Sequence, residues 1–423
     1  MANRPTTEEH RPPSAAETPA GIPALLGVFP QAAFLPFPQK PEVWGRDVLA
    51  ARGISDSKMS GEHARFWIER GKFYVQDLGS RNGTFIDGQK LQPNDKVELV
   101  DGHTVRLAVT IFVFRSAFSG SQTPQPPLGA LVGPWGLSTL RTELNRLRPN
   151  PNPNILLHGP TGTGKELLAQ EVVQRLGRDP QKCTRVNVTS VPEAMFDGQF
   201  FGWERGAFSG ADKTNRGVFL EHDKGAVFLD EIGELPLQIQ PKLLRLLENR
   251  EVLAIGATRP KAVDLAIIGA TNRPLNSTDQ GGSLRTDILA RFSVRYTLPA
   301  LEDRPEDLFA ILQEMWRRRY GALDLTRTRV DAEAVERLML HDWPANVRDV
   351  DRLLSTVDPS HGLTLSAANK FVGGAAHNST PILTKEAVLK ALKDCGNNQS
   401  EAARALGIDR GKLLRYMQKH EIK

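Results

Sequence analysis

Residues 154–166, which read NILLHGPTGTGKE, decide the fold of the central part of the chain. An apolar run typical of a strand passes into the pattern G-x-x-x-x-G-K, and a helix-forming run, ELLAQEVVQRL, follows it. Glycines allow backbone N–H groups to curl around phosphate, and a lysine at a helix N-terminus meets the phosphate charge. Because strand and helix flank the loop as the motif requires, the stretch predicts a nucleotide site made by Gly159, Pro160, Thr161, Gly162, Thr163, Gly164, Lys165 and Glu166.

Polar side chains at the ends of two later strands extend this site. Asp230 and Glu231 follow the buried run AVFL, and Asn272 ends the run AIIGATN, where it would lie near the γ-phosphate of ATP. In such a pair of acids one carboxylate organises Mg²⁺, here Asp230, and the other orients or deprotonates the attacking water. Glu166 stands where the motif usually has a hydroxyl, so Mg²⁺ would depend on Asp230 and on water. Two exposed acids that cap the next helix are the alternative.

Composition and periodicity predict a multidomain protein and the boundaries of its parts. Residues 1–40 are rich in Pro, Ala, Thr and Glu without a period, which predicts a disordered tail. Short alternating runs between Gly, Asn and Asp predict an all-β sandwich over 41–116, and strands alternating with helices predict a parallel α/β sheet over 131–303. The other predicted segments are a linker (117–130), a helical lid (304–372), a second linker (373–381) and an all-α terminal part (382–423).

Charge and cysteine content indicate the kind of partner and the cellular compartment of the chain. Residues 381–423 contain nine Lys and Arg against five Asp and Glu, so +4 of the total net charge of +5 lies there. A basic terminal part suggests nucleic acid as a partner. Only Cys183 and Cys395 occur, which excludes a disulfide framework, and the longest apolar stretch near the start is short and broken by prolines. We therefore expect a cytoplasmic protein that does not enter a membrane.

The predicted sandwich contains WGRD (44–47), MSGEHARF (59–66) and DLGSRNGTFIDG (77–88), and over about 75 residues it resembles a forkhead-associated (FHA) domain. Arginine forks, hydroxyls and amides match phosphate oxygens. The family often has a basic residue where Gly61 stands, so phosphate grip would be weaker unless Lys58 substitutes, and His63 would tie loops together. Ordinary tight turns are the alternative. The resemblance implies that a phosphothreonine protein or peptide is held by Arg46, Ser60 and Asn82, with Arg81 nearby.

Residues 131–372 resemble the AAA+ ATPase domain of the bacterial enhancer-binding proteins that activate sigma-54 RNA polymerase. The family's GESGTGKE occurs here as GPTGTGKE, which makes Glu166 normal for the group. Its defining insertion, GAFTGA, occurs as GAFSGA, and FFGWERGAF replaces the usual LFGHERGAF. Ser209 loses the methyl group of threonine, so we expect weakened coupling. The resemblance implies a sigma-54 contact loop made by Gly206, Ala207, Phe208, Ser209, Gly210 and Ala211.

The glycines at both ends of this insertion predict a loop that can rise and fall, with Phe208 as an apolar anchor at its tip. Burial of one Phe contributes roughly 1.5–3 kcal/mol, so several subunits that offer it together could grip a partner well. The alternative is a surface loop whose phenylalanine folds back into the core of its own protomer.

The same resemblance implies roles for four further residues. Asn187, in RVNVTSV, matches the asparagine that holds Glu231 until substrate is engaged, and Arg348, in WPANVRDV, matches the sensor arginine of the lid. Arg285 and Arg291, in LRTDILARF, match two candidate arginine fingers that reach a neighbouring subunit's γ-phosphate. Six residues on a helix turn through about 240°, so the two arginines cannot point the same way unless the helix breaks. We expect one finger and one structural ion pair, and for Arg348 a plain salt bridge is the alternative.

Residues 382–423 read as three helices with tight turns, and they resemble the Fis-type helix-turn-helix found at the end of these activators. Apolar positions recur at helical spacing: Ala387, Leu389, Leu392, Ala402, Ala403, Leu406, Leu413, Leu414 and Met417. The resemblance implies that Arg410, Lys412 and Arg415 face DNA. A helical hairpin for self-association is the alternative.

Together these features predict an FHA sensor, an AAA+ motor that forms a hexameric ring, and a tail that binds upstream DNA. ATP and Mg²⁺ are the expected cofactors, and sigma-54 RNA polymerase is the expected target. One rival keeps DNA binding and ATPase activity without contact to sigma-54. A second rival is a phosphopeptide-dependent scaffold whose motor is idle.

Overall fold

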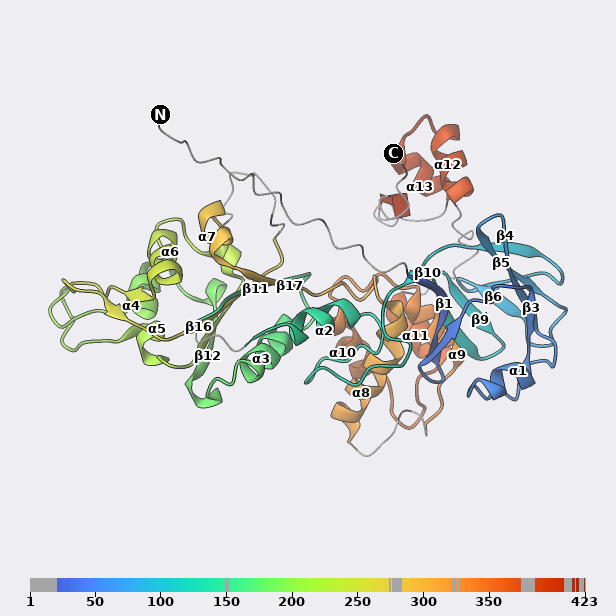
Figure 1. Cartoon of the computed structure of the whole chain (residues 1–423), viewed down its shortest axis with the longest axis horizontal. Helices are drawn as coiled ribbons and strands as arrows, with labels where there is room; N and C mark the ends of the chain where they lie inside the picture. The colour runs from blue at the N-terminus through green and yellow to red at the C-terminus, as the bar shows by residue number, and fades with distance from the viewer. Residues whose placement is uncertain are drawn as a thin grey trace, which may run out of the picture.

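The computed structural model describes residues 21–148, 152–273, 275, 284–321, 325, 328–373, 385–406, 413–414, 416–417 and 422. A β-sandwich stands at one end of the molecule, a parallel sheet with its helices extends to the other, and the helices α8, α10 and α11 lie between them (Figure 1). Among the described residues every helix is too short or too polar to cross a membrane. The predicted fold class, with a sandwich, an α/β sheet and a helical C-terminus, is confirmed.

Two antiparallel sheets form the sandwich. The larger sheet has the strand order β2-β1-β10-β9-β6-β7 and the smaller has the order β3-β4-β5-β8. The short helix α1 (Arg46–Ala51) follows β3. The strands are β1 (Ile22–Phe29), β2 (Ala33–Pro36), β3 (Glu42–Trp44), β4 (Ala64–Glu69), β5 (Lys72–Asp77), β6 (Thr84–Ile86), β7 (Gln89–Lys90), β8 (Lys96–Leu99), β9 (Thr104–Leu107) and β10 (Thr110–Phe118).

The prediction that residues 1–40 are a disordered tail is wrong for residues 21–40. Strand β1 pairs with β10 in antiparallel register, with Leu25 opposite Phe114, and β2 pairs with β1. The run IPALLGVF lacks the alternation of a half-buried strand because both of its faces are covered, and its flanking prolines resemble those of a loop. The sandwich therefore begins at about residue 21, and residues 1–20 lie outside the described part of the chain.

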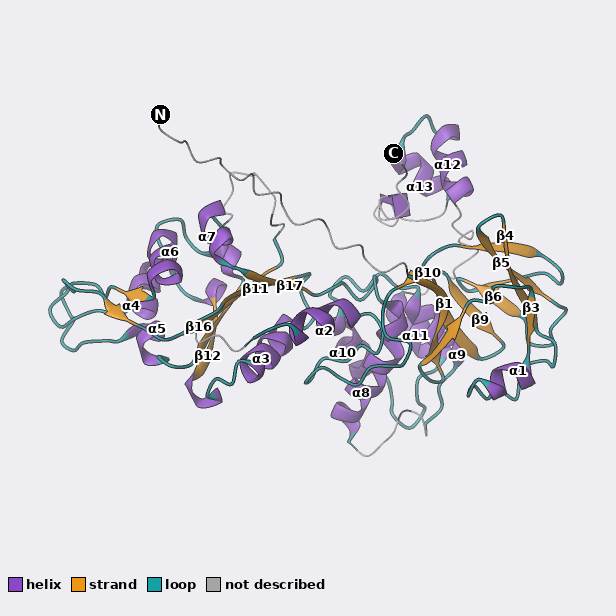
Figure 2. Cartoon of the chain, viewed as in Figure 1, coloured by secondary structure: helices purple, strands orange, loops and turns teal. Residues whose placement is uncertain are grey.

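The large sheet is apolar on both faces because it lies between the smaller sheet and the lid (Figure 2). In β10, Phe112 and Phe114 point into the sandwich core, whereas Ile111 and Val113 pack with the lid helices. The ring of Phe29 meets that of Phe309 edge to face, with 5.0 Å between their centroids. The sandwich and the lid thus share one hydrophobic core.

Buried ion pairs cross this shared core. Arg106 on β9 donates from Nε to Oε2 of Glu336 on the lid at 2.8 Å, and each side chain is only 5% exposed. Arg115 on β10 bonds Glu306 at 2.5 Å. A buried charge without its partner is strongly destabilising, so these pairs fix how the sandwich sits on the lid.

Replacing Glu336 with glutamine should lower the free energy of unfolding by about 2 kcal/mol, because the buried guanidinium of Arg106 then lacks its counter-charge. Urea unfolding would measure the loss. The matched control is Glu333→Gln, which removes a carboxylate that is 51% exposed and 3.4 Å from the same arginine. Equal losses in the two variants would contradict a special weight for the buried pair.

The segment predicted as a linker, 117–130, is packed rather than free. Phe118 meets Trp135 edge to face, and Leu128 is buried in the core of the α/β part. Trp135 donates its indole N–H to the carbonyl of Gly27, and Asp307 accepts backbone N–H bonds from Trp135 and Gly136. Complete burial raises the pKa of Asp307 to about 7. The connection is thereby fastened to both the sandwich and the lid.

The α/β part contains a five-stranded parallel sheet in the order β12-β13-β16-β11-β17. Its strands are β11 (Asn154–His158), β12 (Cys183–Asn187), β13 (Ala226–Asp230), β16 (Ala266–Thr271) and β17 (Val294–Thr297), with β14 (Glu251–Val252) and β15 (Lys261–Ala262) as a separate hairpin. Its helices are α2 (Ser138–Asn145), α3 (Lys165–Arg175), α4 (Phe196–Phe201), α5 (Gly217–Glu221), α6 (Gln240–Asn249) and α7 (Thr286–Arg291).

The lid consists of α8 (Leu308–Tyr320), α9 (Ala332–Met339), α10 (Val347–Thr356) and α11 (Leu365–Val372). Residues 374–381 of the predicted second linker lie outside the described part of the chain. The C-terminal part contains α12 (Lys385–Asp394) and α13 (Gln399–Ala405), which pack through a small apolar cluster that includes Val388, Leu392 and Ala402. Leu389 and Leu414, two of the apolar positions noted at helical spacing, are 46% and 38% exposed.

Candidate nucleotide site and partner-contact loop

The carboxyl ends of the parallel strands meet at one edge of the sheet, and most of the predicted site lies there. Residue Gly159 follows β11, Asp230 ends β13 and Asn272 follows β16. Asn272 donates from Nδ2 to Oγ1 of Thr161 at 3.0 Å, which joins the end of β16 to the phosphate-binding loop. The strand order therefore brings together three stretches that are far apart in sequence.

Lys165 is the first residue of α3 and is buried, with 7% of its surface exposed. Its Nζ donates to the carbonyls of Gly159 at 2.8 Å and Pro160 at 3.2 Å. Burial lowers the pKa of Lys165, although the nearby Glu231 and Asp230 act in the opposite direction. The ammonium group is thus held inside the loop, where a phosphate would meet it.

Glu231 lies directly after β13 in a left-handed backbone conformation, with a φ of 54°. Such a conformation costs a non-glycine residue of order 1–3 kcal/mol and clusters at functional sites. Its N–H donates to Oδ1 of Asp230 at 3.2 Å, so the two acids are locked in relative position. Both acids line the cavity described next, where two different roles are open to them.

A cavity of about 510 Å³ extends from this edge to the lid. Residues 161–167, Asp230, Glu231 and Arg348 line it. Gly162 lies so close to the lid that an added Cβ would be 2.1 Å from the carbonyl oxygen of Ala345. The predicted lid arginine, Arg348, therefore lies at the same cavity as the phosphate-binding loop.

Asn346 is a residue of this region that sequence reasoning missed. It is 3% exposed, accepts the N–H of Leu301 at 2.7 Å and donates from Nδ2 to the carbonyl of Thr161 at 3.0 Å. The next residue, Val347, donates its N–H to the carbonyl of Gly162. The motif WPANVRDV contains Asn346, but a sequence does not say which of its polar residues faces the loop. Asn346 links the lid to the phosphate-binding loop.

Carboxylates suit Mg²⁺, which usually keeps several waters and binds through one or two acids together with substrate phosphates. Asp230 and Glu166 both lie at the cavity, and both are paired with the cationic guanidinium of Arg185. Among the described residues no three His, Cys, Asp or Glu side chains gather as a metal cage. The donor set therefore fits a cation that is held by one protein acid and by the nucleotide.

Asn187 and the two predicted fingers make other contacts. Oδ1 of Asn187 accepts from the N–H and hydroxyl of Thr189, and its bond to Glu231 stays a prediction. Arg285 precedes α7 rather than lying on it, and it pairs with Asp287 at 2.7 Å. Arg291, the last residue of α7, pairs with Glu248 at 2.6 Å. The assumption that both arginines lie on one helix is wrong, because the helix begins after Arg285.

The loop that contains GAFSGA presents its aromatic residue to solvent. Phe208 is 49% exposed, so the alternative of a phenylalanine folded into its own protomer's core is excluded in this conformation. Gly206 and Gly210 have left-handed φ angles of 81° and 96°, which suit glycine. The ring of Phe208 rests edge to face on Trp203 at 5.6 Å.

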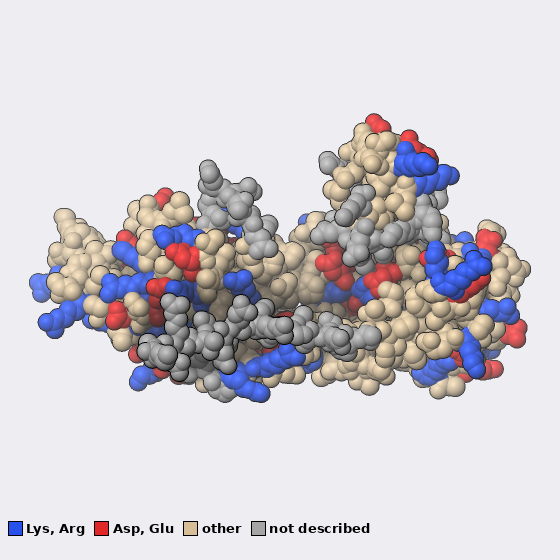
Figure 3. Space-filling model, turned by 45° about the horizontal axis from the view of Figure 1, so that its top comes forward, with Lys and Arg blue, Asp and Glu red and all other residues tan. Residues whose placement is uncertain are grey.

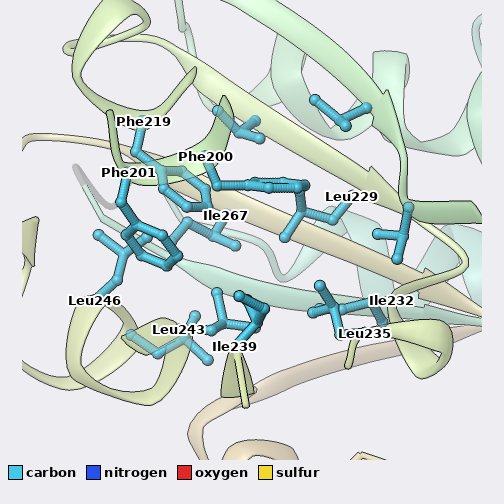
Figure 4. Packing of buried hydrophobic residues seen from close by; sticks show 14 of the residues in the cluster. Phe200, Phe201, Phe219, Leu229, Ile232, Leu235, Ile239, Leu243, Leu246 and Ile267 are labelled. Atoms are coloured by element: carbon cyan, nitrogen blue, oxygen red, sulfur yellow. The ribbon is translucent and has the colours of Figure 1, made fainter. Parts of the chain in front are cut away.

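The base of this loop packs in a cluster of buried aromatic and aliphatic residues of the α/β part (Figure 4). Phe200 and Phe201 on α4 and Phe219 on α5 lie together, and the three rings are buried. The loop leaves the sheet at α4 and returns at α5. A rigid base thus supports a tip whose own apolar side chain has no place in the core.

The predicted phosphopeptide residues come from the start of α1, where Arg46 lies, and from two loops that contain Ser60 and the pair Arg81 and Asn82. Ser60 accepts the N–H of Arg81 at 3.1 Å, and Asn82 donates to the carbonyl of Lys58. Arg46, Arg81 and Asn82 are exposed. His63 accepts the N–H of Ser60 at Nδ1 and its Nε2 lies 3.0 Å from the carbonyl of Gly83, so it ties the loops together as expected.

The three residues predicted to contact DNA lie outside the described residues: Arg410, Lys412 and Arg415. Figure 3 shows Lys and Arg spread over the whole face in view, without one dominant basic surface.

Three family models match the chain. They are the Sigma-54 interaction domain over residues 136–297, the FHA domain over 44–108, and the Bacterial regulatory protein, Fis family, over 383–420. The three predicted resemblances are thereby confirmed.

Similar proteins include two regulators and one solved structure. The nitric oxide reductase transcription regulator NorR2 from Cupriavidus necator is 35% identical over 61% of this chain and 57% of its own length. The transcriptional regulatory protein ZraR from Klebsiella oxytoca is 32% identical over 70% of this chain and 69% of its own length. A crystal structure of NtrX from Brucella abortus in complex with ATP is 25% identical, covers 68% of each chain and has a TM-score of 0.50. The chain spans little more than half the length of NorR2.

Proposed function

This chain belongs to the family of sigma-54-dependent transcriptional activators, and on that premise we propose that it hydrolyses ATP to remodel a sigma-54 RNA polymerase complex. It acts in the bacterial cytoplasm, on promoters near which its C-terminal helices bind DNA. The activity, the target and the partners are proposed for this chain, because the alignment covers only 57% of the length of NorR2.

The observation that carries this proposal is the exposed Phe208 on a loop rooted in the same sheet that carries the nucleotide site. A single exposed apolar side chain is ordinary on a protein surface, but Phe208 lies on the GAFSGA loop within the match to the Sigma-54 interaction domain, where its ring is accessible to a protein partner. Movement of the loop with the nucleotide cycle would bring Phe208 to the sigma factor and withdraw it.

At the nucleotide site each residue has one task. Lys165 and the loop N–H groups bind the β- and γ-phosphates, while Asn272 and Arg348 face the γ-phosphate from the sheet and the lid. Glu231 orients the attacking water and accepts its proton. Asp230 would hold Mg²⁺, which would supply positive charge to the phosphates.

Ring formation would complete the site. Arg285 and Arg291 have side chains that are 47% and 52% exposed, so either can leave its own ion pair for a neighbouring subunit. An arginine supplied in trans typically accelerates phosphoryl transfer by about 10³-fold or more. We infer a homo-oligomer, a hexamer by family, in which one of these arginines reaches the γ-phosphate of the next protomer.

Binding to upstream DNA would raise the local concentration of protomers at the promoter. The Fis-type match over 383–420 and the net charge of +4 in residues 381–423 support DNA as the ligand of the C-terminal part. Phosphate neutralisation by Lys and Arg supplies much of such affinity. We place Arg410, Lys412 and Arg415 at the DNA.

The proposal is tested with the purified full chain, sigma-54 RNA polymerase and a promoter of that class with upstream DNA. Permanganate footprinting should detect strand opening with ATP and not with ADP. ATP turnover without strand opening on any such promoter would favour the rival regulator that does not act on sigma-54. Absence of turnover on DNA would favour the scaffold with an idle motor.

We also propose that the sandwich binds a phosphothreonine protein and thereby regulates the motor. Arg46, Ser60, Arg81 and Asn82 offer charged and polar groups at one exposed rim, as phosphate recognition requires. The sandwich shares a core with the lid, and the lid contacts the phosphate-binding loop through Asn346. A ligand that shifts the sandwich would therefore act on the nucleotide site.

Arg46→Ala should weaken binding of a phosphothreonine peptide about tenfold, because a charge-assisted hydrogen bond is lost. Gly61→Arg should strengthen it severalfold: a Cβ on Gly61 meets nothing within 4 Å, and the new guanidinium restores the basic residue common in the family. Fluorescence anisotropy with a phosphorylated and an unphosphorylated peptide from a degenerate library measures both. Arg65→Ala, an exposed arginine on β4, is the control, and an equal loss there would contradict the assignment.

A further inference from the structure

Arg185 on β12 joins two acids of the nucleotide site. Its Nη2 lies 2.8 Å from Oδ2 of Asp230, and its Nη1 pairs with Oε2 of Glu166. The guanidinium is 39% exposed and lines the cavity, whereas the carboxylate of Asp230 is only 15% exposed. One cation thus spans the gap between the end of β13 and the first turn of α3.

These two acids stand at the positions from which such a site usually holds a metal ion, namely the residue after the lysine and the acid at the end of β13, which β16 separates from β11. Two carboxylates there repel each other and repel nucleotide phosphates unless a positive charge lies between them. Arg185 supplies that charge from the chain itself. Its fork geometry can serve both acids at once, which an ammonium group cannot do as well.

We propose that Arg185 is a resident counter-ion of the nucleotide site, which holds Asp230 when Mg²⁺ is not bound and releases it when Mg²⁺ arrives. Arg185 then keeps its bond to Glu166. It is a positioning residue, since it acts through Asp230. The inference deepens the proposed function and rests on it, because it takes Mg²⁺ and a nucleotide as the ligands.

Two opposite effects follow for a chain that lacks this guanidinium. Without Mg²⁺, Asp230 and Glu166 stay uncompensated and disfavour the nucleotide. With Mg²⁺, the metal no longer competes with Arg185 for Asp230, so the nucleotide binds more tightly. Loss of a residue that only bound phosphate would lower nucleotide affinity both with and without Mg²⁺. Loss of a residue that only stabilised the fold would not change one of these two affinities relative to the other.

The test titrates a fluorescent ADP analogue into the full chain, once in excess EDTA and once in excess Mg²⁺. For Arg185→Ala we expect the Kd in EDTA to rise and the Kd in Mg²⁺ to fall, each by roughly threefold to fivefold, the range that partly exposed ion pairs support. Arg185→Lys should lie between. The matched control is Arg245→Ala, which removes an arginine of similar exposure, paired with Glu251 at 3.3 Å and remote from the cavity.

Circular dichroism spectra equal to wild type would show that the variants are folded. An unchanged ratio of the two Kd values in folded Arg185→Ala, or a parallel weakening in both buffers, would overturn the proposal. A wild-type chain that binds the analogue in neither buffer would overturn the proposed function itself, and this inference with it.

Discussion

Lys165→Ala should reduce ATP affinity about 10-fold to 100-fold, because hydrogen bonds to charged groups contribute about 1.5–3 kcal/mol each and Lys165 meets more than one phosphate oxygen. Hydrolysis should fall further, by about 10³-fold in all, since the same ammonium group stabilises charge that develops on the phosphates. Isothermal titration with ATP and a phosphate-release assay measure the two effects separately.

The buried position of Lys165 makes this variant informative. The ammonium group is bonded to Gly159 and Pro160, so its loss also frees two loop carbonyls, and thermal unfolding should be recorded beside the binding data. Lys182→Ala, an exposed lysine of the same part of the chain, is the control. ATP affinity that is equal in both variants would remove Lys165 from the site.

Phe208→Ala should abolish strand opening at a sigma-54 promoter and leave ATP turnover close to wild type. Loss of one buried phenyl contact costs roughly 1.5–3 kcal/mol, about 10-fold to 100-fold in the occupancy of the partner, and a ring would lose it at every protomer. Permanganate footprinting and phosphate release, run on one preparation, separate the two functions.

Ser209→Thr tests the same loop in the opposite direction. The added methyl group should raise strand opening by about fourfold, the value of one further buried carbon. Leu365→Ala, an exposed apolar residue on the lid, is the control for a general loss of surface apolarity. If wild type, Phe208→Ala and Ser209→Thr open the promoter equally, the loop is not the coupling device.

Features set by local sequence could be predicted well. The phosphate-binding loop, Asp230 and Asn272 follow strands whose parallel arrangement forces their ends together, so spacing alone indicated a shared edge. The exposed Phe208 was predictable for a similar reason, since a short glycine-flanked loop offers little room to bury a phenyl ring.

Features that depend on distant partners could not be predicted. The sequence of strand β1 lacks the alternation of a half-buried strand because both of its faces are covered. The smaller sheet covers one face, and Trp135 and the lid cover the other. Arg185 and Asn346 have no local signal, because the groups that they bond lie as far as 45 and 185 residues away in sequence. Arg285 was misplaced by a single residue, because it is the N-cap of α7 rather than a helical residue.

The apolar outer face of the large sheet limits how this protein can be divided. Were the chain cut after Phe118, Ile111, Val113 and Phe29 would be left bare on one fragment and their helical partners on the other. Each fragment would then be prone to aggregate. A sandwich fused alone to the motor of another protein would expose the apolar face of its large sheet to solvent. A fragment for expression or for fusion to another protein should therefore include both the sandwich and the lid.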